Sequence, residues 1–239
     1  MLTLRKLPEK TNTIVGCSSS EFSLFDKDDG RQAIFGCCIM QNWGILGGTF
    51  DPIHWGHLLM AETALIQADL DKVIWVPSFS PPHKQAMEFE HRSSMVQLAI
   101  ADHPSFALAP VEANLQAIDY AIHSLNYLQS LYPHTHWHWI IGMDAFTTLP
   151  RWYRRQELVT ICDWLVAPRP STHVQLDDTQ VAQQLALQGM TIRSSLLAMP
   201  SVGISSSLIR QYCRQGRSIR YLVPEAVRIY IDTHKLYSN

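Results

Sequence analysis

Two histidines, His54 and His57, stand three residues apart with Gly56 between them. This spacing can aim both imidazoles at one phosphate group, because His57 falls at the expected start of a helix, where free backbone N–H groups attract anions. Gly47 and Gly48 precede them and can let the backbone turn sharply and approach a ligand closely. The alternative is two satisfied or solvent-exposed histidines at a helix cap. A predicted strand before the segment and a predicted helix after it favour phosphate binding.

Further along the chain, several polar residues also suit a phosphate. Lys84 is a compact cation, although a solvated surface lysine is the default alternative. Ser205 and Ser206 open a predicted helix whose backbone N–H groups, with one hydroxyl, could cradle phosphates; the alternative is an ordinary serine N-cap. Arg210 lies one turn into that helix and could reach the same phosphates or remain a solvated side chain.

These residues must be positioned by short apolar segments that alternate with helical patterns. The predicted strands cover residues 43–46, 73–76, 106–109, 137–141, 164–167 and 191–198. The predicted helices cover residues 56–68, 91–101, 120–131, 177–187, 205–215 and 224–234. Such alternation is typical of an α/β fold with a mainly parallel sheet and helices on both faces. Ligands bind beyond the C-terminal strand ends of such sheets, so the candidate loops are those after Leu46, Val76, Ile141 and Ala198.

The first 39 residues differ in composition from the rest of the chain. They contain a serine run at 18–20 and a charged patch at 26–30. We expect residues 1–39 to form a mostly disordered extension and residues 40–239 to form one domain. Met40 stands directly before the first predicted strand, so translation could also start there.

Composition argues against several classes of protein. Hydrophobic residues make up 46% of the chain and charged residues 17%, which suffices for a sizeable core. The net charge of −2 gives no sign of nucleic-acid binding or of a polybasic membrane anchor. The apolar runs are shorter than the about 20 residues that span a bilayer. Five scattered cysteines without a CxxC pair predict neither a zinc site nor a disulfide framework, and they favour a reducing cytoplasm.

The segment GGTFDPIHWGHL resembles the signature of the nucleotidylyltransferase superfamily, and specifically that of bacterial nicotinate-nucleotide adenylyltransferases. Further segments resemble motifs of that family, in order and with similar spacing, over roughly residues 43–237. They are the PPHK loop at 81–84, His91 and Arg92 with Met95, IGMD at 141–144, Trp152, the Arg169-Pro170 turn, ISSSLIR at 204–210 and YLVP at 221–224. Each piece alone is weak evidence, whereas the combination is highly specific.

The resemblance implies a Rossmann-like, doubly wound sheet. It also implies transfer of the adenylyl group of ATP to nicotinate mononucleotide, which yields deamido-NAD and pyrophosphate. The implied catalytic residues are His54, His57, Lys84 and Arg210. The implied ATP-binding residues are Gly47, Gly48, Thr49, Phe50, His54, His57, Gly142, Asp144, Ile204, Ser205, Ser206 and Arg210. The implied mononucleotide-binding residues are Lys84, Tyr120, Ala121, Trp152, Tyr153 and Arg169.

Some of these residues have competing interpretations. Asp144 could bind ribose hydroxyls or cap a helix. Trp152 could stack on the pyridine ring or belong to the core or to a lid. For Asp51 we expect a structural role that fixes its loop. Mg²⁺ is expected with ATP, held largely by phosphates and waters rather than by a dedicated protein site.

One departure from the family affects the expected acceptor. The family usually has Ser-Tyr-Thr-x-x-Thr where this chain has DYAIHS at 119–124, so Ala121 replaces a threonine that helps to hold the nicotinate carboxylate. Nicotinamide mononucleotide is therefore an alternative acceptor, and a non-catalytic nucleotide-binding module is an alternative of a different class. Phosphopantetheine adenylyltransferase remains a third alternative, disfavoured by the Trp152 segment and the YLVP ending. We expect small-molecule partners and neither nucleic acid nor membrane, and we leave a homo-oligomer open.

Overall fold

The computed structural model describes residues 22–25, 32–35, 40–79, 86–110, 120–168 and 178–238. The chain divides into two units, 1–40 and 41–239. In the smaller unit, β1 (Phe22–Phe25) pairs antiparallel with β2 (Gln32–Phe35). The sequence predicted a mostly disordered extension and did not predict this pair, because strands of four residues are too short to show a recognisable alternation. The rest of 1–39 lies outside the described residues.

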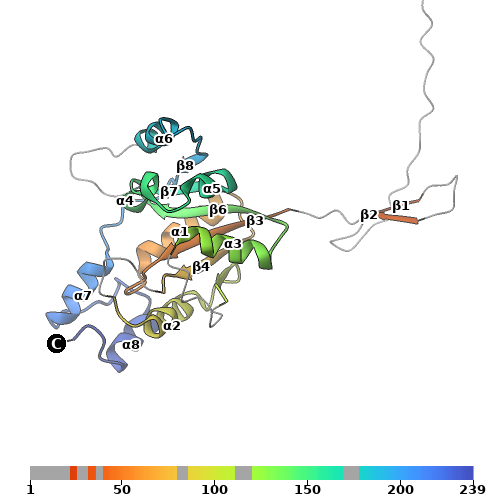
Figure 1. The fold of residues 1–239 in the computed structure, drawn as a ribbon. Helices are drawn as coiled ribbons and strands as arrows, with labels where there is room; N and C mark the ends of the chain where they lie inside the picture. Colours follow the sequence, from red (N-terminus) through yellow and green to blue (C-terminus); the bar gives the residue numbers. More distant parts are fainter. Residues whose placement is uncertain are drawn as a thin grey trace, which may run out of the picture. The chain divides into compact units, whose positions relative to one another are not determined.

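The larger unit is built on one parallel sheet (Figure 1). Its strands within the described ranges are β3 (Gln41–Gly48), β4 (Lys72–Pro77), β5 (Phe106–Leu108), β6 (Thr135–Gly142), β7 (Cys162–Ala167) and β8 (Ser194–Leu196). The spatial order is β5-β4-β3-β6-β7-β8, and every neighbouring pair runs parallel. Counted from β3, this is the 3-2-1-4-5-6 order of dinucleotide-binding folds, which confirms the predicted doubly wound sheet.

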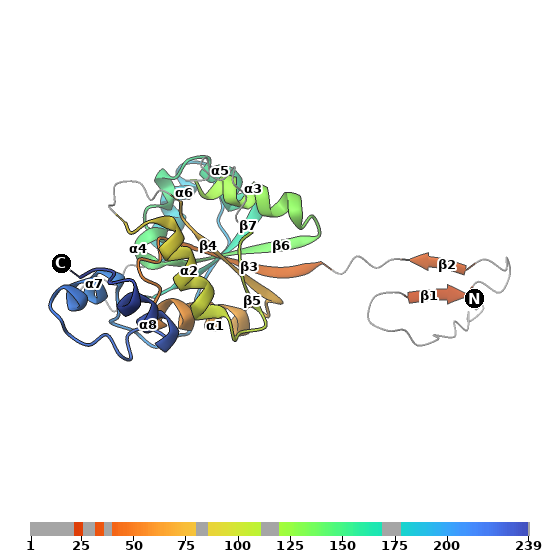
Figure 2. The ribbon, with the colours of Figure 1, turned by 90° about the horizontal axis from the view of Figure 1, so that it is seen from below.

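Helices cover both faces of this sheet. In Figure 2, α1, α7 and α8 lie below the sheet and α3, α5 and α6 lie above it. The helices are α1 (Trp55–Gln67), α2 (Phe89–Ile100), α3 (Ala121–Leu131), α4 (Met143–Phe146), α5 (Arg155–Ile161), α6 (Asp178–Ala186), α7 (Ser206–Arg214) and α8 (Glu225–Thr233), with a 3₁₀ turn η2 (Leu149–Arg151). Side chains of α1, α2, α7 and α8 form one core cluster, and those of α3 to α6 form the other.

The strands alternate their side chains between these two clusters. In β6, Trp137, Trp139 and Ile141 join the cluster of α3 to α6, whereas Ile140 joins the cluster of α1, α2, α7 and α8. This period of two is what a strand buried on both faces requires, because successive side chains point to opposite faces. The faces of β6 therefore follow directly from the alternation in its sequence.

The connection between β6 and β7 differs from the prediction. Residues 143–161 form α4, η2 and α5, for which the sequence analysis predicted no helix. Elements of three to seven residues are too short to display a helical period. The last predicted strand, 191–198, is shorter than expected and covers Ser194–Leu196 only. No helix among the described residues is long and apolar enough to cross a membrane.

Candidate active site

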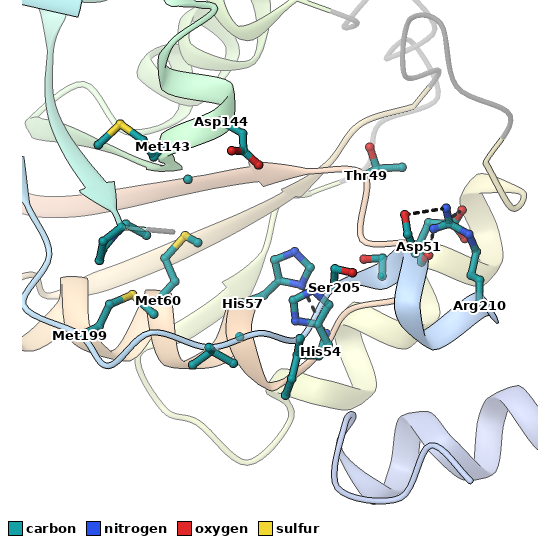
Figure 3. Close-up of a pocket in the computed structure, with 18 of the residues that line it drawn as sticks. Thr49, Asp51, His54, His57, Met60, Met143, Asp144, Met199, Ser205 and Arg210 are labelled. Atoms are coloured by element: carbon teal, nitrogen blue, oxygen red, sulfur yellow. Dashed lines mark hydrogen bonds and ion pairs between the residues drawn. The ribbon is translucent and has the colours of Figure 1, made fainter. Parts of the chain in front are cut away.

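A cavity of about 570 Å³ opens beyond the C-terminal ends of β3, β6 and β7 (Figure 3). This volume falls within the about 300–1,000 Å³ of ordinary small-molecule sites. The cavity also lies where the strand order reverses, between β3 and β6, which is where ligands bind in open parallel sheets. The predicted nucleotide-binding residues that line it are Thr49, His54, His57, Gly142, Asp144, Ile204, Ser205, Ser206 and Arg210.

The histidine pair is held by the first turn of α1. His54 is the N-cap residue, with extended backbone at φ −150° and ψ 170°, and His57 is the third helical residue. The backbone N–H of His54 donates to Nδ1 of His57 at 3.3 Å, and the backbone N–H of His57 donates to the carbonyl oxygen of His54 at 2.9 Å. Since Nδ1 of His57 accepts, its neutral ring carries the proton on Nε2, which leaves Nε2 as the donor for a ligand.

Burial favours the uncharged form of both imidazoles. The rings stack with centroids 3.8 Å apart, and His54 is buried. Burial lowers the pKa of His54 from 6.5 to about 4. Burial, and secondly the neighbouring His54, lower the pKa of His57 well below 6.5. A bound polyanion would favour the protonated rings, so the pair can gain positive charge as phosphate arrives.

The glycines of this loop provide space for neighbouring side chains, and they do not form its turn. A Cβ on Gly56 would lie 3.0 Å from both Cε1 and Nδ1 of the His54 ring, and a Cβ on Gly48 would lie 2.9 Å from the Phe50 ring. Gly47 and Gly48 complete β3, and the left-handed residue is Phe50 with φ 51°. The sequence predicted that Gly47 and Gly48 allow a sharp turn. In the structure, Gly48 and Gly56 instead leave room for rings that pack against the backbone.

Phe50 supports His57 from behind. Its side chain is buried, and its ring lies edge-on to the His57 ring with centroids 5.1 Å apart. It also packs on Trp75 at 5.5 Å. Phe50 is not among the lining residues of the cavity, and neither are Gly47 and Gly48. The Phe50 ring thus packs against His57 and Trp75, and its predicted contact with ATP stays a prediction.

The start of α7 forms the facing wall of the cavity. Ser205 is its N-cap, and its Oγ accepts a hydrogen bond from the backbone N–H of Leu208 at 3.2 Å. The Ser206 hydroxyl donates to the carbonyl oxygen of Pro52 at 2.9 Å, which ties α7 to the histidine loop. Both hydroxyls are therefore engaged as capping and bridging groups. The unpaired backbone N–H groups of a first helical turn remain as the anion-binding element.

Arg210 fixes the loop that carries the histidines. Its Nη1 donates to the Asp51 carbonyl oxygen at 2.6 Å and lies 3.6 Å from the Asp51 carboxylate. Its Nη2 donates to the Ser207 hydroxyl at 3.3 Å. The Asp51 carboxylate in turn accepts a hydrogen bond from the Tyr237 hydroxyl at 2.6 Å, so Asp51 has the structural position that we expected. The Arg210 side chain keeps 28% exposure and also lines the cavity.

Arg92 is a positioning residue; its family-like motif was recognised in the sequence, but no role was predicted for its side chain. Its guanidinium is buried and donates to three backbone carbonyl oxygens: Met87 at 2.7 Å, Thr49 at 2.8 Å and Phe79 at 3.0 Å. These carbonyls belong to the loop after β3, the loop after β4 and the approach to α2. One side chain therefore ties together the two loops that flank the cavity. Its sequence signal was a place on the buried stripe of α2, three and four residues before Met95 and Val96.

Asp144 lines the cavity from the other side of the switch point. Gly142 ends β6 and is the N-cap of α4, so Asp144 is an exposed residue of the first turn and not the cap. Figure 3 shows its carboxylate facing the cavity across from His57. This position suits binding of ribose hydroxyls and removes the helix-cap alternative for Asp144.

The described members of the predicted mononucleotide-binding set are not among the residues that line this cavity. Tyr120 and Tyr153 are each 53% exposed, and their rings pack with centroids 4.9 Å apart. Ala121 is the first residue of α3, directly after Tyr120. Trp152 is half-buried and packs edge-on against Trp139 and Trp164, and its Nε1 donates to Thr148 Oγ1 at 2.8 Å. Lys84 and Arg169 lie outside the described residues.

Comparison with known proteins decides the family. A family model described as cytidylyltransferase-like matches residues 45–212. A probable nicotinate-nucleotide adenylyltransferase of Trichormus variabilis is 57% identical over 204 residues, which cover 83% of this chain and 98% of that protein. The chain belongs to the nicotinate-nucleotide adenylyltransferase family. A probable nicotinate-nucleotide adenylyltransferase of Geotalea uraniireducens still shares 38% identity and covers 82% of this chain and 98% of its own length.

Solved structures support the fold of this adenylyltransferase family member. A Plasmodium falciparum nicotinic acid mononucleotide adenylyltransferase complexed with NaAD superposes with a TM-score of 0.68 at 20% identity, covering 82% of this chain and 97% of that one. The same Plasmodium enzyme complexed with APC gives a TM-score of 0.66 at 19% identity. At this identity, the likeness concerns the fold alone.

Proposed function

We propose that the protein transfers the adenylyl group of ATP to the phosphate of nicotinate mononucleotide, with deamido-NAD and pyrophosphate as products. The observation that carries this proposal is one cavity bounded by two helix N-termini, those of α1 and α7, with His54 and His57 at the first of them. Two such ends provide backbone N–H groups for a polyphosphate. The adenylyltransferases that share up to 57% identity with the chain support the same reaction.

The reaction depends mainly on how the two reacting phosphates are positioned. An oxygen of the acceptor phosphate attacks the α-phosphorus of ATP while the bond from that phosphorus to the bridging oxygen breaks, and pyrophosphate leaves. No covalent enzyme intermediate is needed, so the enzyme must align the two phosphates and stabilise the developing charge. Nε2–H of His57 donates to a non-bridging oxygen of the α-phosphate, and His54 binds the same triphosphate. The first turn of α7, at Ser205 and Ser206, holds the β- and γ-phosphates.

Arg210 and Lys84 complete the phosphate site in this proposal. Arg210 faces the cavity while its guanidinium is oriented by Asp51 and Ser207, so it is pre-organised to attract the departing pyrophosphate. A guanidinium that needs little reordering loses little entropy on binding. Lys84 adds the point charge that the resemblance implies.

Mg²⁺ would enter as the complex with ATP. Asp51 is already engaged by Tyr237 and Arg210, so Asp144 is the one carboxylate at the described lining that could contact a hydrated ion. Such a lining fits an ion that keeps most of its waters and binds through substrate phosphates. When bound, Mg²⁺ neutralises part of the charge on the phosphates.

The acceptor is nicotinate mononucleotide rather than its amide. Tyr120 and Tyr153 form an exposed aromatic pair near the start of α3, and such rings can stack on a pyridine ring. Backbone N–H groups near Trp152 bind the nicotinate carboxylate, which in the family a threonine helps to hold. A cytoplasmic location stays a prediction, and a homo-oligomer stays open.

Pyrophosphate release tests this proposal with ATP, Mg²⁺ and either nicotinate or nicotinamide mononucleotide. We expect kcat/KM at least about tenfold higher for the acid, since a hydrogen bond to a charged group contributes about 1.5–3 kcal/mol. The variant Ala121→Thr should raise this preference, and the matched variant Ala121→Val, which lacks the hydroxyl, should not. Comparable rates with both would transfer the assignment to the amide, and no release with either would contradict adenylyl transfer to a pyridine mononucleotide.

A further inference from the structure

A second cluster of chemically capable side chains lies near the N-terminal ends of β6 and β7, at the other end of these strands from the active site. His136 and His138 alternate on β6, so both point to the same face. Asp163 on β7 is the register partner of His138. Neighbours in register share a face, so the three side chains meet there. His138 is four residues before Gly142, which places the cluster about 13 Å along the strand from the active-site end.

The ligand atoms of this cluster are close enough to share one ion. Nε2 of His136 lies 2.9 Å from Oδ2 of Asp163, and Nε2 of His138 lies 3.9 Å from the same oxygen. One nitrogen or oxygen atom from each of the three residues falls within 4.8 Å of the others. Around a tetrahedral zinc ion with bonds of about 2.0–2.1 Å, ligand atoms stand about 3.3 Å apart. Small side-chain rotations therefore bring all three into bonding distance.

A cavity gives access to the cluster. About 360 Å³ of open space is lined by His138, Asp163 and Arg193, together with Gln67 and Ala68 from the end of α1. Water in this space can supply the remaining ligands of an ion. The side chains of His136 and Asp163 are 36% and 29% exposed, so an ion can enter from solvent.

We propose that His136, His138 and Asp163 form a binding site for a divalent transition-metal ion, with zinc as the favoured ion. Two imidazoles and one carboxylate select zinc over magnesium, which prefers oxygen ligands. The cysteine pattern of the sequence predicted no zinc site, whereas this ligand set contains no cysteine. An ion here would connect β6 to β7 and would stabilise the native state, because the unfolded chain lacks the assembled site.

Arg193 is the competitor for the same carboxylate. It forms an ion pair with Oδ1 of Asp163, and its side chain is 52% exposed. Oδ2 is the oxygen that faces the histidines, so the ion and Arg193 can use different oxygens. The alternative is a surface network of ion pairs without metal, and the two differ in whether zinc binds stoichiometrically.

Metal binding to the full chain, made metal-free and without an affinity tag, tests the proposal. We expect one equivalent of Zn²⁺ in equilibrium dialysis and a higher melting temperature with zinc than without it. His136→Ala and His138→Ala should each weaken binding by at least about 100-fold, since even outer-shell changes cost 10–100-fold. The matched control His134→Ala, at an exposed histidine of the same segment, should bind like the wild type. Co²⁺ in place of zinc should give a four-coordinate absorption spectrum that His136→Ala abolishes.

Three results would overturn the proposal. One is a wild-type chain that binds no stoichiometric zinc at micromolar concentration. Another is a His136→Ala variant, folded by circular dichroism, that binds zinc as tightly as the wild type. The third is zinc that is lost in His57→Ala but kept in His136→Ala, which would place the ion in the active site. These readouts do not depend on adenylyl transfer, so they stand apart from the proposed function.

Discussion

The buried, uncharged state of His54 makes the stability of the fold depend on pH in a calculable way. Native His54 has a pKa of about 4, whereas an unfolded histidine has a pKa near 6.5. Between these values the unfolded chain binds a proton that the native chain does not, so the free energy of unfolding rises with pH in this window. The contribution is complete above pH 6.5 and is lost as the pH falls towards 4.

The magnitude follows from the same two values. At pH 5 the unfolded histidine is 1.5 pH units below its pKa, and each unit costs about 1.4 kcal/mol, so His54 lowers the free energy of unfolding by about 2 kcal/mol relative to pH 8. His57 shifts in the same direction and adds to the loss in the wild type. His54→Asn keeps a side chain suited to an N-cap and removes the titrating group.

Urea unfolding of the wild type and of His54→Asn at pH 8 and pH 5 measures this difference. The wild type should lose about 2 kcal/mol more than the variant between the two pH values. His134→Asn, at an exposed histidine, is the control and should follow the wild type. Equal losses in the wild type and in His54→Asn would refute the claim that His54 is held neutral by burial.

Further variants test residues that position the groups of the active site. Gly56→Ala places a Cβ 3.0 Å from the His54 ring and should lower kcat roughly tenfold or more in a pyrophosphate-release assay, with little change in melting temperature. Arg92→Met leaves the carbonyl oxygens of Met87, Thr49 and Phe79 without their donor and should lower the free energy of unfolding in urea by about 3–5 kcal/mol; a loss below about 1 kcal/mol would contradict its positioning role. Ser205→Ala removes the N-cap bond to Leu208 and should cost about 1 kcal/mol and raise the KM for ATP.

The sequence predicted the strands and longer helices of the larger unit well, because their apolar periods are long enough to recognise. β6 and α1 are examples: the first alternates between two buried faces, and the second follows a histidine N-cap. The short elements α4 and α5 carry too few residues for a period, and their positions depend on packing against β6 and β7. Tertiary contact, rather than local pattern, decides such segments.

For the site, the sequence predicted residue types but not what each side chain contacts. The motif indicated that Phe50 and His57 belong together, yet only the fold reveals that Phe50 packs behind the His57 ring. Arg92 illustrates the same limit, because a helical arginine is by default a surface residue and its three carbonyl partners come from separate segments. The cluster of His136 and Asp163 likewise cannot be predicted from the sequence, because it forms only when β6 and β7 are placed in register.

The central claim, that the His54–His57 pair acts on the phosphates of ATP during adenylyl transfer, is tested most directly by His57→Ala. The measurement is the single-turnover rate of dinucleotide formation from ATP and nicotinate mononucleotide, with Mg²⁺ and saturating substrates. Loss of a donor to the developing charge should lower this rate by roughly 100-fold or more, while the variant still folds and still binds ATP. A rate within about twofold of the wild type would contradict the role assigned to His57.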